Sequence, residues 1–447
     1  MRFVASLFLI FLLLLGCVRH PEQEILDLRC LPQSASAYLD PATADQALLS
    51  EQQQQERAAL FRRNFYRPWH VDTPLDKPES IFWAIEWITK KLTLGEQDSL
   101  LYGANLRPYS GSRLQTFIAA ADRASYPSLN LNAITLRRTA IRALPTLQPC
   151  FLNPAAAGEG YPFDYLQNSL LEAGVPIKIT HRTVDGAWLL IESVLVSGWV
   201  QANNVALVDG DFIATYEATP LLAITVENIA VSDDGTGHFR FYARIGTLLP
   251  QRARQHDHYQ VLLPINAGNG WAKLATAQIN LSAAGLFPMP LNSRAVATLA
   301  DWFLGQNYGW GGSSDARDCS ATLRDLFIPF GIWLPRNSSK QAEAGETIAL
   351  KGLSLKEKEQ VIAQQARAYF SLLCMPGHIM LSLGNHLGYP VVLHTMWGLK
   401  TSDLLHGAGR KVVGKTVITT LQPGIELLNL AFPAGNLLYR IDRLTLL

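Results

Sequence analysis

Two neighbouring stretches decide the fold of the last third of this chain: residues 307–312 read Asn-Tyr-Gly-Trp-Gly-Gly, and residues 315–321 read Asp-Ala-Arg-Asp-Cys-Ser-Ala. The glycines predict a turn that leads the chain to Cys319. Apolar residues then recur at the spacing of one helix face, namely Leu323, Leu326, Phe327 and Phe330. We therefore expect a helix that carries Cys319 in its first turn and Asp318 as its N-cap.

A cysteine at this place has the surroundings of a nucleophile. The positive end of the helix dipole and the unpaired amides of the first turn stabilise a thiolate. The same amides can receive an oxyanion. The alternative for any single cysteine is a small buried core residue, but the glycine turn before Cys319 favours reactivity. Cys374 has neither a turn nor a helix start beside it and is expected to be structural.

Two later stretches provide the histidines that a cysteine nucleophile needs. Such a nucleophile requires an imidazole base and a third group that orients the base. Residues 376–384 read Pro-Gly-His-Ile-Met-Leu-Ser-Leu-Gly, and residues 389–394 read Tyr-Pro-Val-Val-Leu-His. Each stretch is typical of a strand, and the intervening loop 384–388 predicts a hairpin.

The pairing of this hairpin determines whether its two histidines meet. If Ser382 faces Pro390, then His378 faces His394, and the two imidazoles are cross-strand neighbours on one face. A slip of one residue would separate them. The alternative is that a hairpin carries two core histidines by chance.

The segments before this region differ in their patterns. After an apolar run, residues 14–17 read Leu-Leu-Gly-Cys, which is typical of a bacterial lipobox, so we expect cleavage before a lipidated Cys17. Two units with a Gly-Trp phrase, at 198–199 and 270–271, resemble bacterial SH3-like barrels, although a single irregular β domain is the alternative. The expected organisation is a signal peptide 1–16, a lipid-anchored tether 17–44, an N-terminal helical or stabilising domain 45–148, SH3-like domains 149–211 and 212–290, and an α+β catalytic domain 291–447.

Composition excludes several classes of function. The chain has 447 residues with 38 basic and 37 acidic side chains, and a net charge of +1 argues against nucleic-acid binding. Cysteine and histidine spacings indicate no metal site, and no cofactor is expected. A disulfide between Cys30 and Cys150 is left open, because the four cysteines after Cys17 are scattered and do not define a disulfide framework.

The combined motifs resemble the NlpC family of papain-like cysteine peptidases. The resemblance rests on Tyr-Gly-Trp-Gly-Gly followed by Asp-Cys-Ser, then Gly-His-Ile-Met-Leu-x-Leu-Gly, then Val-Leu-His. It implies a papain-like fold with Cys319 as nucleophile, His378 as base and His394 orienting His378. Relatives hydrolyse the γ-D-glutamyl–diaminopimelate bond of peptidoglycan stem peptides, so stem peptides or murein fragments are the implied partners.

The resemblance also implies the residues around the substrate. Oxyanion and substrate-binding roles fall on Tyr308, Trp310, Asp318, Ser320, Arg336, Asn337 and Ser338. In relatives the first SH3-like domain restricts the site to peptides with a free L-Ala amine. Trp199, or an acidic or aromatic residue within 159–165, is the candidate for that contribution here. The chain departs from the family in Ala321, where Gly is usual, and in Asn337, where Asp is frequent.

Two other functions remain open from the sequence. One is an amidase or acyltransferase on the same fold, and the other is a non-catalytic wall-binding lipoprotein. The expected location is the cell envelope, with the protein lipid-anchored to a bacterial membrane and facing the periplasm or the exterior. The sequence leaves open which membrane holds the anchor, whether intact sacculi are cut, and the oligomeric state.

Overall fold

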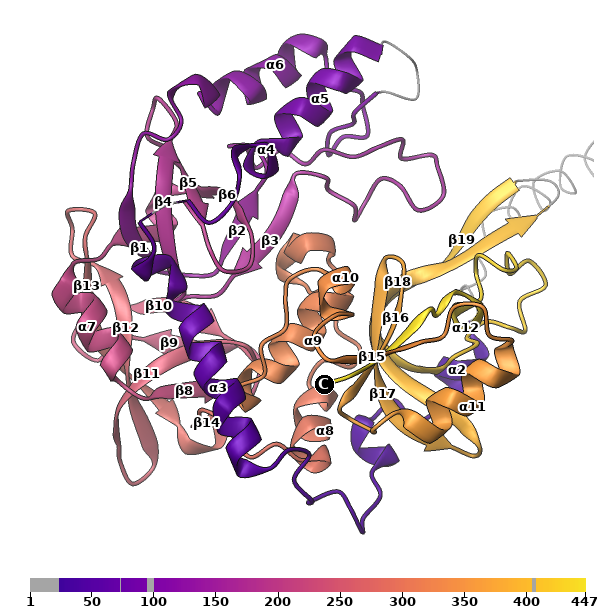
Figure 1. Ribbon diagram of the computed structural model, residues 1–447. Coiled ribbons are helices and arrows are strands. Elements are labelled where there is room, and N and C mark those ends of the chain that lie inside the picture. The colour runs from indigo at the N-terminus through magenta and orange to yellow at the C-terminus, as the bar shows by residue number, and fades with distance from the viewer. Residues whose placement is uncertain (1–23, 73, 95–99, 404–406) are drawn as a thin grey trace, which may run out of the picture.

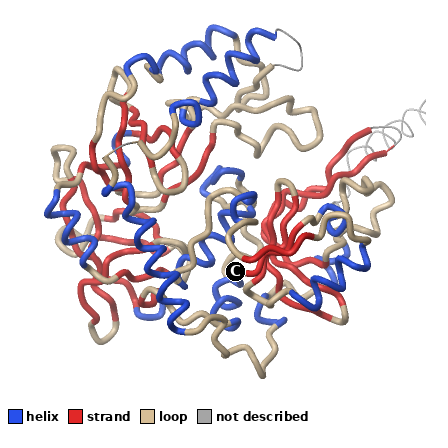
Figure 2. Tube along the Cα trace, in the orientation of Figure 1, coloured by secondary structure: helices blue, strands red, loops and turns tan. Residues whose placement is uncertain are grey.

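The computed structural model describes residues 24–72, 74–94, 100–403 and 407–447. The predicted signal peptide and Cys17 lie outside the described residues. Strands gather in three groups with helices around and between them (Figure 2). Within these described ranges, no helix has the length and the apolar character needed to cross a membrane.

The C-terminal part is an α+β domain built on one sheet. Its strands run in the order β15-β20-β16-β17-β18-β19. They are β15 (Glu346–Ala349), β16 (Ser371–Met375), β17 (His378–His386), β18 (Tyr389–Asp403), β19 (Gly407–Thr420) and β20 (Arg443–Leu446). The helices are α8 (Ser293–Asp301), α9 (Cys319–Phe327), α10 (Ser338–Gln341), α11 (Leu355–Gln365) and α12 (Leu437–Arg440).

Helix α9 packs its apolar face against this sheet. Leu323, Leu326 and Phe327 belong to one buried cluster that also contains Leu381 of β17 and Leu393 of β18. The predicted helical stripe is thereby confirmed. The first turn of the helix lies near the start of β17, because the backbone N–H of Ile379, the residue after His378, hydrogen-bonds toward the Cys319 thiol.

The predicted pairing of the histidine hairpin is wrong. Ser382 faces Val392 and not Pro390. The register is displaced by two residues, because the turn is tighter than expected and β17 carries a bulge after Ser382. Side chains alternate with a period of two, so this displacement keeps His378 and His394 on one face as diagonal neighbours.

The first barrel contains more chain than predicted. Its seven-stranded sheet has the order β3-β2-β6-β5-β4-β1-β7. The strands are β1 (Leu131–Thr135), β2 (Thr139–Arg142), β3 (Gln167–Leu171), β4 (Pro176–Arg182), β5 (Trp188–Glu192), β6 (Ser197–Gln201) and β7 (Val205–Leu207). Strands β1 and β2 precede residue 149, so the expected boundary at that residue cuts through this sheet.

A second barrel follows helix α7 (Gly210–Ala218). Its main sheet has the order β13-β12-β11-β8-β14, and β9 and β10 form a separate pair. The strands are β8 (Leu221–Ile224), β9 (Ile229–Ser232), β10 (Phe239–Ala243), β11 (Leu248–Arg254), β12 (His258–Asn266), β13 (Ala272–Asn280) and β14 (Ala284–Leu286). The two predicted β units are therefore built on separate sheets.

The N-terminal helices lie over the barrels and share their cores. They are α3 (Glu51–Tyr66), α4 (Pro78–Ile81), α5 (Trp83–Leu94) and α6 (Gly111–Ala120). Ile85 and Phe117 pack with Leu190 and Trp199 of the first barrel. Helix α3 crosses in front of the second barrel (Figure 1).

Residues 24–44 do not form the free tether that was predicted. They carry α2 (Leu26–Cys30) and a short helix at Ala35–Tyr38. The Asp27 carboxylate accepts hydrogen bonds from the amide and hydroxyl of Thr420, at 2.7 and 2.8 Å. Tyr369 donates its hydroxyl to the Ala35 carbonyl at 2.8 Å. This segment is docked on the C-terminal domain because its polar groups find specific partners there.

Candidate active site

Cys319 begins helix α9, as the sequence predicts. Asp318 is the N-cap, and its Oδ1 accepts the amide of Ala321 at 2.9 Å. The turn before it requires glycine: Gly311 has φ +63°, and a Cβ there would stand 2.3 Å from the carbonyl oxygen of Gln167. The turn therefore packs directly against strand β3 of the first barrel, which positions Cys319 relative to that barrel.

A line of hydrogen bonds leads away from His378. Its Nε2 lies 2.8 Å from Nδ1 of His394. Nε2 of His394 lies 3.1 Å from the hydroxyl of Thr419. Thr419 donates that hydroxyl to the carbonyl of Thr420 at 2.7 Å.

This line assigns the tautomers of both histidines. A carbonyl cannot donate, so the single proton of the Thr419 hydroxyl points to Thr420, and the hydroxyl oxygen accepts from Nε2–H of His394. Nδ1 of His394 is then a lone pair, which accepts from Nε2–H of His378. The Nδ1 atom of His378 is left unprotonated, which is the state that a general base requires.

The sulfur of Cys319 lies within the same group of atoms. The backbone N–H of Ile379, the residue after His378, hydrogen-bonds toward the thiol and lowers its pKa, as does the N–H of Ser320. Tyr308 is close enough that, after burial, the charge of Cys319 is the next cause that raises the phenol's pKa. The structure thus brings together all three residues of the predicted catalytic set and Tyr308.

Burial governs the protonation of the pair. Burial and the Asp318 carboxylate raise the pKa of Cys319 to about 12, so the helix N-terminus acts in the predicted direction but is outweighed. Burial, together with Arg440, lowers the pKa of His378 to about 4. A thiolate alone or an imidazolium alone is costly at this buried site. Moving one proton from the thiol to the imidazole creates both charges together, and their attraction offsets the desolvation.

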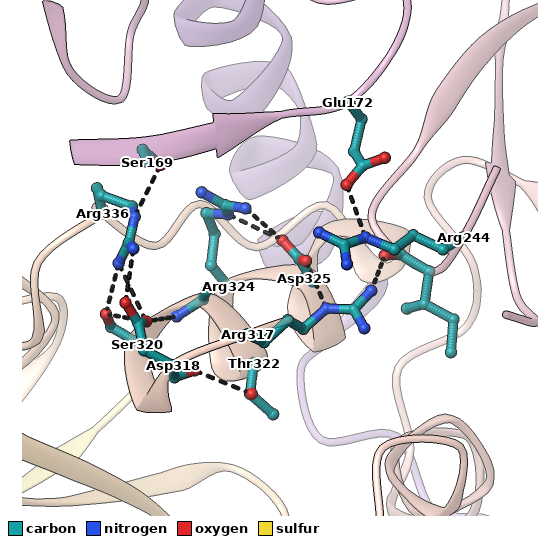
Figure 3. Close-up of polar contacts among 12 residues, drawn as sticks. Ser169, Glu172, Arg244, Arg317, Asp318, Ser320, Thr322, Arg324, Asp325 and Arg336 are labelled. Carbon is teal, nitrogen blue, oxygen red and sulfur yellow. Dashed lines mark hydrogen bonds and ion pairs between the residues drawn. The ribbon is translucent and has the colours of Figure 1, made fainter. Parts of the chain in front are cut away.

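Arg336 joins the helix start to the first barrel (Figure 3). Its guanidinium donates to both Asp318 oxygens, at 3.1 and 2.6 Å, and to Ser320 Oγ at 2.9 Å. Its Nε donates to Ser169 of β3 at 2.8 Å. Although burial raises the pKa of Asp318, Arg336 outweighs burial and keeps that pKa below its usual value. The carboxylate beside the thiol is therefore ionised and held in place.

Arg317 joins the same region to the second barrel (Figure 3). It donates to Asp325 at 2.7 Å and to both oxygens of Glu227 at 3.0 Å. All three side chains are buried. A buried guanidinium with two carboxylates resists displacement, because removing one partner leaves an uncompensated charge. Both barrels thus hold the chain that flanks Cys319.

Aromatic side chains from the first barrel cover this site. Phe163 lies 5.4 Å from Trp310 and 6.0 Å from Trp397, between ring centroids. Tyr165 lies 5.0 Å from Trp310. Asp164, between them, accepts from the Arg142 guanidinium at 2.6 Å, which fixes the loop. Of the two candidates from the first barrel, the aromatic side chains within 159–165 are therefore the ones that reach the site.

The other candidate from that barrel is wrong. Trp199 is fully buried, packed beside Leu190 and helix α5, because its strand position faces the core. Asn337 is exposed and its side chain does not cap α10, whereas Ser338 is half-buried. Cys374 is buried in the sheet core, as expected of a structural thiol.

Cys30 and Cys150 are both free thiols. Within the described ranges, no group of three or more His, Cys, Asp or Glu side chains is arranged to hold a metal ion. Residues that sequence reasoning missed are Thr419, Ser169, Arg317, Trp397, Arg410 and Arg440. Their partners come from distant elements, so no local motif marks them.

Sequence profiles of known families match four parts of the chain. The NlpC/P60 family matches residues 305–388, and its N-terminal stabilising domain matches residues 6–126. SH3 domains of the SH3b1 and SH3b2 types match residues 149–201 and 209–255. Residues 305–388 therefore form an NlpC/P60 domain, preceded by the matches to the stabilising domain and to two SH3 domains. An NlpC/P60 domain implies a cysteine peptidase, and the SH3 domains are consistent with peptidoglycan binding.

Two solved structures are similar to this chain. An NlpC/P60 endopeptidase from Photobacterium damselae subsp. piscicida is similar at a TM-score of 0.81 and 23% identity, covering 93% of this chain and 96% of that one. An NlpC/P60 family protein from Bacillus cereus is 14% identical, with a TM-score of 0.48, over 70% of this chain and 98% of that one. Comparison with curated proteins finds no match.

Proposed function

We propose that this protein is an endopeptidase of the cell envelope that hydrolyses the γ-D-glutamyl–diaminopimelate bond of peptidoglycan stem peptides. The observation that carries the proposal is the line His378–His394–Thr419, which leaves the Nδ1 lone pair of His378 available, while the N–H of the next residue, Ile379, hydrogen-bonds toward the Cys319 thiol. In this assignment Cys319 is the nucleophile, His378 the base and His394 the residue that orients it.

The geometry supports a two-step reaction. The thiol passes its proton to Nδ1 of His378, and the sulfur attacks the carbonyl carbon of the γ-D-glutamyl amide. Amides of the first turn of α9 and the Tyr308 hydroxyl stabilise the oxyanion. His378 then protonates the leaving amine of diaminopimelate, and a thioester to Cys319 remains. Water, deprotonated by His378, attacks the thioester and releases the γ-glutamyl carboxylate.

The covering loop supports small fragments as substrates. Tyr165 packs against Trp310 and narrows the space that the first barrel leaves beside the site. A muramyl group on the L-Ala amine would add bulk on that side. We infer a preference for stem peptides with a free L-Ala amine. Asn337, which brings no charge, would contribute little to it.

We further propose that Cys17 is lipidated and anchors the enzyme to a membrane. The Leu-Leu-Gly-Cys sequence after an apolar run supports this proposal. Cys17→Ser should move the protein from the membrane fraction to the soluble fraction. Unchanged retention, with no acyl mass on the wild-type N-terminal peptide, would contradict it.

The activity is tested by mass spectrometry of products from L-Ala-γ-D-Glu-diaminopimelate, its N-acetylated form and intact peptidoglycan. We expect L-Ala-D-Glu and diaminopimelate from the free tripeptide, slower cleavage of the acetylated form, and no product with Cys319→Ser. Release of an amine other than diaminopimelate would contradict the assigned bond. Equal rates on free and acetylated peptides would contradict the preference for fragments.

A further inference from the structure

A cavity of about 130 Å³ opens beside His378, and its lining contains no residue of helix α9. It is lined by the start of β17, by 396–400 of β18, and by the side chains of Phe163 and Tyr308. Two guanidinium groups also line it, those of Arg410 on β19 and Arg440 on α12. Neither arginine follows from the sequence motifs.

Neither guanidinium forms an ion pair with a carboxylate in the described part of the chain, although the charge of Glu159 raises the pKa of Arg410. Among the residues that the structure describes, no carboxylate lies within ion-pair distance of Arg410 or Arg440. The buried Nε of Arg410 has no hydrogen-bond partner in that same part of the chain. Arg440 donates one hydrogen bond, to the carbonyl of Pro376 at 2.9 Å. The Glu159 carboxylate lies on the Arg410 side and accepts a hydrogen bond from Tyr165 at 3.4 Å.

Holding these two cations together has a cost. Burial lowers the pKa of both guanidinium groups. The charge of Arg440 lowers the pKa of Arg410 further. Elsewhere around α9 the buried guanidiniums are paired: Arg336 with Asp318, and Arg317 with Glu227. Two half-buried arginines on one cavity without a carboxylate are the arrangement expected of a site that binds an anion.

The reaction determines which part of the substrate enters this cavity. His378 gives its proton to the leaving amine, so that amine must lie on the His378 side of the thiol. Asp318, Ser320 and Arg336 form a hydrogen-bonded group at the start of α9, and none of them lines the cavity. The cavity beyond His378 therefore receives the residue that leaves.

We propose that Arg410 and Arg440 form a subsite for a carboxylate of the leaving diamino acid. The inference rests on the proposed function and adds the residues that select its leaving group. The carboxylate can come from two places in the substrate. One is the side-chain carboxylate that diaminopimelate has and lysine lacks, and the other is the main-chain carboxylate of a tripeptide.

The test compares three substrates of the full chain: L-Ala-γ-D-Glu-diaminopimelate, the same peptide with its main-chain carboxylate amidated, and L-Ala-γ-D-Glu-L-Lys. Loss of one charge-assisted contact should lower kcat/KM by about 10- to 100-fold. A selective loss with the lysine peptide identifies the side-chain carboxylate as the ligand. A selective loss with the amidated peptide identifies the main-chain carboxylate.

Arg410→Gln and Arg440→Gln should lower the rate on the preferred substrate and leave the rate on the disfavoured one nearly unchanged. The two single variants keep the test valid if one fails to fold, and circular dichroism checks both. Lys356→Gln removes a cation from an exposed site on α11 that does not line the cavity. This control should leave the ratios of kcat/KM between the three substrates unchanged. Arg410→Lys, which keeps the positive charge, should recover part of the substrate preference that Arg410→Gln loses.

Three results would overturn the subsite. They are equal wild-type rates on all three substrates, equal losses on all substrates in both arginine variants, or unchanged preference in both. In each case the bond between D-Glu and the third residue is still cut. If wild type cuts this bond in no substrate while Cys319 remains alkylatable, the proposed function itself is wrong, and the subsite falls with it.

Discussion

Thr419 is expected to set the reactive tautomer of the histidine pair without touching the substrate. Its hydroxyl accepts from Nε2–H of His394 at 3.1 Å, and it donates to the Thr420 carbonyl. Thr419→Val keeps the volume and removes the acceptor. In the reactive tautomer, Nε2–H of the buried His394 would then be a donor without a partner.

The magnitude follows from that lost partner. A buried, unsatisfied donor costs about 1–3 kcal/mol. The competing tautomer places the proton on Nδ1 of His394, which donates to His378 and forces the proton of His378 onto its Nδ1. That imidazole cannot act as a base. Because about 1.4 kcal/mol corresponds to a factor of ten, kcat should fall roughly 5- to 150-fold.

The assay is steady-state hydrolysis of the free tripeptide, with KM measured separately. We expect kcat to fall and KM to change little, because Thr419 is buried behind His394. Thr419→Ser keeps the hydroxyl and should restore most of the rate. Nitrogen-15 NMR of the histidines should show the exchange of tautomers in Thr419→Val only. A folded Thr419→Val enzyme with wild-type kcat and unchanged histidine spectra would refute the reasoning.

Three further predictions concern other parts of the site. Cys319→Ala should abolish hydrolysis and Cys374→Ala should leave it largely intact; a folded but inactive Cys374→Ala enzyme would reverse the assignment. Because burial holds the pKa of His378 near 4, below its ordinary 6.5, the imidazole stays neutral as pH falls, and kcat/KM should keep its plateau through pH 6.5 and decline only toward 4; an acidic limb centred at 6.5 would contradict this. Glu227→Gln, which breaks a buried pair, should destabilise the protein by about 3 kcal/mol and lower its unfolding temperature, whereas Asp45→Asn at an exposed pair should barely change it; equal shifts would contradict the role given to the buried pair.

Sequence reasoning succeeded where the chemistry is local. The N-cap, the glycine turn and the helix that carries Cys319 follow from one short stretch, because capping and helical periodicity act over a few residues. It also placed His378 and His394 on one face of a hairpin. This placement was right although the predicted register was wrong, because a displacement by two residues keeps each side chain on the same face of the sheet.

Only the tertiary structure decided which distant groups complete the site. Thr419 meets His394 because β19 pairs with β18, and nothing in the local pattern of β19 marks that contact. Phe163 lies in a loop of the first barrel and contacts Trp310 of the site, whereas the Trp199 side chain is buried in the core of that barrel. Arg410 of β19 and Arg440 of α12 are distant in the sequence, and only the folded chain brings them to one cavity. Burial and long-range pairing depend on the whole packed chain, so they cannot be read from any single segment.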